Sequence, residues 1–206
     1  MRSIRADEKE SFGTLFFLKI CIIQKKAVLL QSQKFLNMAK RYILLAEEGE
    51  LSLLDKARAE LGLDLRDAEV IITGVGGINI IRSLQDLDRE AELYNIGYAG
   101  SANFELGTWV EVSEVRLNHP NVKYEEPRLM LVDESLGAEL PLEHKTRRAV
   151  CYTNCDFVLQ SEYKDCVFDM ELAFIASFGF KRLHALKYVS DNLSLHAYHD
   201  LTHGVE

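Results

Sequence analysis

Short apolar runs alternate with amphipathic segments along most of this chain, and few folds accommodate that alternation. Short apolar or alternating runs are typical of strands, and they predict strands at 42–46, 69–73, 93–96, 108–115, 149–152 and 184–189. Residues 51–61 have apolar positions three and four apart and are followed by Gly62, which predicts a helix with a glycine stop. Further helices are expected at 78–87 and at 170–178, and the apolar residues 166–168 lead into the second of these helices. The order of elements predicts an α/β fold, a single domain with a largely parallel or mixed central sheet flanked by helices.

Composition excludes several classes of protein. The 206 residues have a net charge of −8, and lysines and arginines are adjacent only in pairs such as Arg147-Arg148, which argues against a nucleic-acid partner. No run approaches the roughly 18 apolar residues of a membrane span, so no membrane association is expected. Four cysteines in a chain of this length do not make a disulfide framework, and we expect a reduced, cytoplasmic setting.

The first 37 residues differ from the rest in charge. They carry seven lysines and arginines against three acids, a net of +4. Their apolar stretch at 16–23 has neither the charge pattern nor the cleavage site of a signal peptide. An extra helix or strand is one interpretation. We prefer to treat 1–37 as an N-terminal extension, outside the core of a domain formed by 38–206.

Chemically interesting residues follow four of the predicted strands. In α/β sheets, ligands bind at the carboxyl ends of the strands. The four strand ends carry Glu47-Glu48-Gly49-Glu50, Gly74-Val75-Gly76-Gly77, Gly97-Tyr98-Ala99-Gly100-Ser101 and Ser190-Asp191-Asn192. Each segment also has a plain structural interpretation, as an acidic first helical turn, a tight turn or a surface loop. Their joint occurrence favours a ligand site.

Four motifs in order resemble the purine nucleoside phosphorylase/nucleosidase superfamily, most of all the methylthioadenosine/S-adenosylhomocysteine nucleosidases. The resemblance covers about residues 40–195 and rests on Thr73-Gly74-Val75-Gly76, Asn95-Ile96-Gly97-Tyr98-Ala99-Gly100, Phe168-Asp169-Met170-Glu171 and Val189-Ser190-Asp191. It implies a nucleoside phosphorylase-like fold, an enzyme of purine nucleoside metabolism and methionine salvage, and a small-molecule purine nucleoside as substrate.

The resemblance also implies residue roles. Glu50 matches the carboxylate that activates the attacking water, and Asp191 the acid that protonates the purine N7. Glu171 matches the residue that holds the ribose hydroxyls. The other substrate-binding positions are Met170 against the sugar, Phe157 stacked on the base, Val158 reading the base edge through its backbone, and Gly100 and Ser190 beside the acid. These roles suit the chemistry, because cleaving an N-ribosidic bond needs an activated water, stabilisation of a cationic sugar and protonation of the leaving purine.

Hydrolysis is favoured over phosphorolysis. A phosphate nucleophile needs a cationic pocket. The first strand is followed by Glu47-Glu48-Gly49-Glu50, and the third-strand motif begins with Asn95 where the related phosphorylases have arginine. A phosphorylase, a futalosine-type hydrolase and a degenerate member that binds nucleosides without turnover stay open as alternatives.

No cofactor and no metal are expected. His196, His199 and His203 have spacings that would place three imidazoles on one helix face, but a polar tail is the favoured interpretation. A homodimer is expected, because Phe104, Leu106 and Trp109 would leave apolar surface to cover.

Overall fold

The computed structural model describes residues 40–118, 130–131, 140, 142 and 146–198. The expected extension, 1–37, lies outside the described residues. Strands and helices follow in the order β1 (Arg41–Leu45), η1 (Glu48–Glu50), α2 (Leu51–Leu61), β2 (Glu69–Ile72), α3 (Gly77–Leu84), β3 (Glu92–Gly100), β4 (Trp109–Leu117), β5 (Met130–Leu131), β6 (Arg147–Thr153), β7 (Cys166–Asp169), α4 (Leu172–Ala176) and β8 (Arg182–Asp191).

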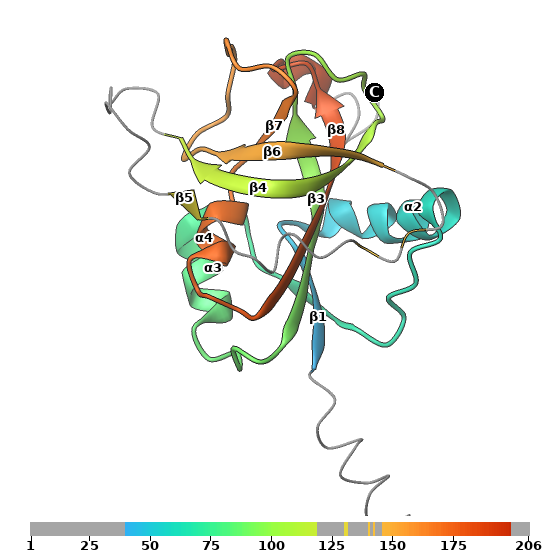
Figure 1. Ribbon diagram of the computed structural model, residues 1–206, viewed down its shortest axis with the longest axis vertical. Coiled ribbons are helices and arrows are strands. Elements are labelled where there is room, and N and C mark those ends of the chain that lie inside the picture. Colours follow the sequence, from blue (N-terminus) through green and yellow to red (C-terminus); the bar gives the residue numbers. More distant parts are fainter. Residues whose placement is uncertain (1–39, 119–129, 132–139, 141, 143–145, 199–206) are drawn as a thin grey trace, which may run out of the picture. The chain divides into compact units, whose positions relative to one another are not determined.

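The sheet is mixed, as the sequence predicts. Strands β2, β1, β3 and β8 are adjacent in that order and parallel. Strand β4 is antiparallel to β8 and parallel to β6, which is parallel to β7. Strand β7 then returns to β3 through the antiparallel pair Gly100 and Phe168. The pairings therefore close β3, β8, β4, β6 and β7 into a ring, in which β4 and β6 run across β3 and β8 (Figure 1).

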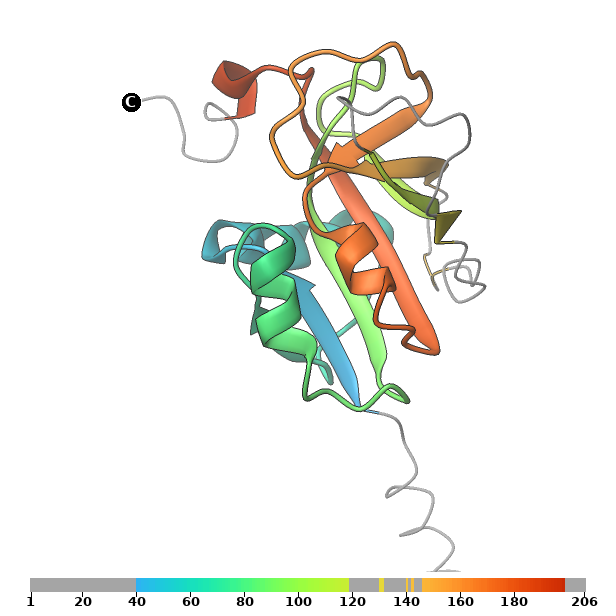
Figure 2. The same cartoon turned by 90° about the vertical axis from the view of Figure 1, so that its left-hand side faces the viewer.

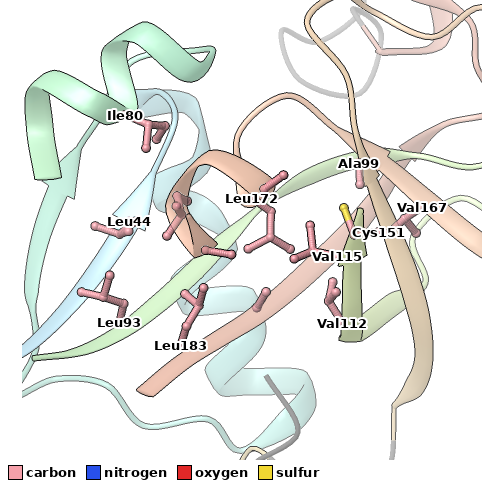
Figure 3. Close-up of a cluster of buried hydrophobic side chains, with 14 of the residues drawn as sticks. Leu44, Ile80, Leu93, Ala99, Val112, Val115, Cys151, Val167, Leu172 and Leu183 are labelled. Carbon is pink, nitrogen blue, oxygen red and sulfur yellow. The ribbon is translucent and has the colours of Figure 1, made fainter. Parts of the chain in front are cut away.

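Helices cover both faces of the parallel strands. Helices α3 and α4 contact each other on one side of β1, β3 and β8, and α2 lies on the opposite side (Figures 1 and 2). Because side chains alternate along a strand, Leu44 packs with α3 and α4, while Ile43 and Leu45 pack with α2 on the other side. The larger core continues from Leu44 and Leu93 through Leu172 to Cys151 inside the ring (Figure 3).

Two expectations are wrong in detail. Residues 166–169 form a full strand, β7, paired with β6, and only Leu172–Ala176 of the expected helix at 170–178 is helical. Phe104 and Trp109 are buried, at 8% and 6% exposure, so they do not supply the free apolar surface expected of them. Of the three, only Leu106 is exposed. No helix in the described ranges is both long enough and apolar enough to cross a membrane.

Candidate active site

The carboxyl ends of β1, β3 and β8 meet at a cavity of about 280 Å³. Its lining comprises Ala46, Glu47, Glu50, Val75, Tyr98, Ala99, Gly100, Phe157, Phe168, Asp169, Met170, Glu171, Ser190, Asp191 and Tyr198. A pocket of about 30 Å³ adjoins it and shares six of these residues. Seven of the eight site residues predicted from the sequence line the cavity, and Val158 lines the adjoining pocket. Chain segments far apart in sequence are thus brought to one place.

Glu50 is buried and held by the backbone. It lies at the end of η1 and is 5% exposed. Its Oε2 accepts a hydrogen bond from the Ala46 N–H at 2.5 Å, and its Oε1 accepts one from the Tyr98 N–H at 2.9 Å. Burial raises the pKa of Glu50, against these hydrogen bonds, which lower it. A fixed carboxylate of this kind can accept a proton from water at the cavity wall.

Glu171 is anchored to the glycine-rich segment after β2. Its Oε1 accepts a hydrogen bond from the Gly76 N–H at 2.8 Å, and its Oε2 accepts one from the Met170 N–H at 3.2 Å. Burial, and then repulsion by the nearby Asp169, raise the pKa of Glu171 to about 7. The segment at 74–77 therefore supplies a backbone donor to the carboxylate.

Asp191 ends β8 and is 1% exposed. The Ser190 hydroxyl donates to its Oδ2 at 2.8 Å, and the Leu193 N–H donates to its Oδ1 at 2.9 Å. Burial raises the pKa of Asp191. A raised pKa favours the protonated form that a general acid needs.

Two glycines of β3 give the carboxylates room. A Cβ added at Gly97 would lie 2.7 Å from the Glu50 Oε1. A Cβ added at Gly100 would lie 2.8 Å from the Asp191 Oδ1. Only a residue without a Cβ allows both carboxylates to approach β3 this closely, which explains the glycines of the third-strand motif.

A buried ion pair beside the cavity is not among the features that the sequence predicts. Lys187 in β8 is 1% exposed, and its Nζ lies 2.7 Å from the Asp169 Oδ2. Asp169 also accepts hydrogen bonds from the Thr153 hydroxyl at 2.5 Å and from the Leu172 N–H at 3.0 Å. Attraction by Asp169 outweighs the effect of burial and raises the pKa of Lys187. The indication that the sequence offers is a lysine between Leu186 and Tyr188 in a predicted strand.

Aromatic rings form another wall of the cavity. Tyr198, in the helical turn at 195–198, lies edge-on to Phe157 and Tyr98, with centroids 5.8 and 6.3 Å apart. Its hydroxyl donates a hydrogen bond to the Glu47 Oε1 at 2.9 Å. Tyr198 is not among the site residues that the sequence predicts.

The cavity is acidic. Among the described residues that line it, five are carboxylates and none is a lysine or arginine. Lys187 is not part of this lining, but it brings a positive charge close to the cavity through its ion pair with Asp169. Such a lining favours neutral or cationic ligands over phosphate.

Within the described residues, no group of three or more histidines, cysteines or acids could hold a metal ion. His199 and His203 lie outside these residues.

Comparison with solved structures shows that nucleosidases share this fold, as the sequence resemblance predicts. An MTA nucleosidase (MTAN) from Chlamydia trachomatis matches with a TM-score of 0.58 at 17% identity, covering 81% of this chain and 88% of that one. The S-adenosylhomocysteine nucleosidase of Streptococcus pyogenes, solved with 5-methylthiotubericidin, matches with a TM-score of 0.57 at 19% identity over 81% and 90% of the two chains. The futalosine hydrolase of Helicobacter pylori gives a TM-score of 0.55 at 17% identity over 80% and 91%. Neither a family model nor a curated protein matches the sequence.

Proposed function

We propose that the protein hydrolyses the N-ribosidic bond of purine nucleosides, with methylthioadenosine and S-adenosylhomocysteine as the first substrates to test. The observation that carries the proposal is the meeting of three buried carboxylates, Glu50, Glu171 and Asp191, around one cavity. Solved nucleosidases with the same fold support it.

Each of the three carboxylates has its own role in the reaction. Glu50 takes a proton from water as the water attacks the anomeric carbon. Asp191 delivers a proton to N7 as the purine leaves, which its raised pKa favours. Glu171 accepts hydrogen bonds from the 2′- and 3′-hydroxyls and places a carboxylate near the cationic sugar.

The neighbouring residues hold the substrate. Phe157 stacks on the base, and the Val158 backbone reads its edge. Met170 lies against the sugar. Gly100 and Ser190 set the position of Asp191, since Gly100 leaves space for its carboxylate and Ser190 donates a hydrogen bond to it.

The acidic lining supports hydrolysis over phosphorolysis, because no residue that lines the cavity in the described part of the chain is a cation that could bind a phosphate nucleophile. No cofactor is needed for this reaction. The proposal includes a homodimer, since apolar side chains beside the cavity are exposed in the single chain.

Purine release from methylthioadenosine tests the reaction. We expect the rate to be the same with and without phosphate, and Glu50→Gln and Asp191→Asn each to lower kcat by ~10²–10⁴. A nitrophenyl riboside, whose leaving group departs without protonation, should be cleaved by Asp191→Asn better than by Glu50→Gln. Accumulation of ribose 1-phosphate would identify a phosphorylase. Binding without purine release would identify a non-catalytic nucleoside-binding protein.

A further inference from the structure

A lysine is buried among the carboxylates of the candidate site, and the proposed reaction does not use it. Lys187 lies in β8, the strand that ends at Asp191, and its side chain is 2% exposed. Its Nζ lies 2.7 Å from the Asp169 Oδ2, and the Asp169 side chain is 0% exposed. Removing two charges from water costs free energy, which a buried ion pair recovers only through good geometry and further hydrogen bonds. The contacts of this pair therefore indicate what it does.

The acidic partner of the lysine fixes the segment that carries Glu171. Asp169 ends β7, and Glu171 lies directly before α4. The Asp169 Oδ2 accepts a hydrogen bond from the Leu172 N–H at 3.0 Å, and its Oδ1 accepts one from the Thr153 hydroxyl at 2.5 Å. The Thr153 oxygen in turn accepts a hydrogen bond from the Ala173 N–H at 2.9 Å. Asp169 thus holds the first residues of α4, and with them the position of Glu171.

The same pair determines the charge around Glu171. Burial, and then repulsion by Asp169, raise the pKa of Glu171 to about 7, while attraction by Lys187 opposes this rise and repulsion by Glu50 adds to it. Burial also raises the pKa of Glu50, and Lys187 again opposes the rise. The Cys151 thiol, which also faces the lysine, is neutral because burial raises its pKa well above the ordinary value. The charge of the lysine is thus felt by two of the carboxylates that the reaction needs.

We infer, on the basis of the proposed nucleoside hydrolysis, that Lys187 is a positioning residue of the active site and acts on Glu171 through Asp169. Its charge balances that of Asp169, so Asp169 can hold the start of α4 without adding a net negative charge beside Glu171 and Glu50. Lys187 is 1% exposed and is not among the residues that line the cavity, so it does not touch the substrate. Glu171 and Glu50 lose their protons at a lower pH than they would without the lysine.

The pH dependence of purine release tests the inference. Lys187→Met removes a positive charge, so the buried carboxylates together hold an extra proton at neutral pH, whichever of them carries it. The acid limb of kcat/KM should move to higher pH by about one pH unit or more, since a charge at this distance changes a neighbouring pKa by ~1–3. Asp169→Asn removes the repulsion on Glu171 and should move the limb to lower pH. The double variant Lys187→Met with Asp169→Asn should return it close to the wild-type position.

An exposed ion pair on the same strand end provides the control. Lys181, directly before β8, pairs with Glu90, and both side chains are more than half exposed. Lys181→Met should keep the wild-type pH profile, because an exposed pair has little effect on its surroundings. A role of Lys187 in folding alone would lower the melting temperature of both single variants, but it would not move their acid limbs in opposite directions.

The outcomes separate the inference from the proposed function. An acid limb that stays in place in Lys187→Met, or that moves the same way in both single variants, overturns the inference and leaves the hydrolysis in place. If Lys187→Met does not fold, Asp169→Asn and the double variant decide: an unmoved limb in the first, or a displaced limb in the second, overturns the inference. No purine release from the wild type overturns the hydrolysis. In that case carboxyl ¹³C NMR of Glu171, assigned with Glu171→Gln, decides the inference. The pKa of Glu171 should be lower in Asp169→Asn than in the wild type, and equal values overturn it.

Discussion

At the residue scale, Gly97 determines where the Glu50 carboxylate can lie. Gly97→Ala would place a methyl group 2.7 Å from the Glu50 Oε1, so this oxygen must move away from the Tyr98 N–H that holds it. Because Glu50, the general base of the proposed reaction, is then misplaced, we expect kcat to fall by ~10² or more while the melting temperature changes little. Purine-release kinetics and calorimetry measure the two effects. Gly49→Ala is the control, since its added Cβ has no contact nearer than 4.0 Å. Wild-type kcat in Gly97→Ala would contradict this account of the motif.

Glu171 makes the stability of the fold depend on pH. Its pKa is about 7 in the folded protein against an ordinary value of 4.5, so the folded chain holds this proton more tightly than the unfolded chain does. The resulting stabilisation is full below about pH 4.5 and is lost as the pH rises to about 7. We therefore expect the free energy of unfolding to fall over this range, and to fall less in Glu171→Gln. Urea unfolding at several pH values measures the difference. A variant with the wild-type slope would contradict the assignment.

At the element scale, local patterns were enough to predict most strands and helices. Apolar runs identified β1 and β2, and regular apolar spacing identified α2 with its correct ends. The boundary between β7 and α4 was missed because a four-residue apolar strand leads directly into a short helix. Residues 166–169 form a strand because they pair with β6, and a local sequence pattern carries no information on that pairing.

The candidate site, too, could be predicted from the sequence only in part. Strand-end motifs, with the family they resemble, predicted the residues that line the cavity. The contacts that hold these residues were not predictable, because their partners are distant in sequence. Gly76 and Glu171 are 95 residues apart, and Glu47 and Tyr198 are 151 apart. The ion pair of Lys187 with Asp169 likewise joins two strands that do not pair directly.

At the scale of the whole molecule, an apolar face beside the cavity favours association of two chains. Val75 precedes α3, and Ile78 and Ile81 lie in it. The three side chains are spaced three residues apart and are 47%, 70% and 50% exposed. Val75 also lines the cavity, so a partner that covers this face would complete one of its walls. Closed homodimers bury the same patch of both chains, and an exposed apolar helix face suits that arrangement.

We therefore expect light scattering to give a dimer, about twice the 23.5 kDa of the chain, at micromolar concentration. Ile78→Lys with Ile81→Lys should convert it to a monomer, because each new charge would have to be buried at the interface. The same double variant should raise KM in purine-release assays, since the wall next to Val75 is then open to water. Leu159→Lys is the control: this side chain is 62% exposed and lies outside both α3 and the cavity lining. A monomeric wild type, or a double variant that stays dimeric, would mean that α3 is not the interface.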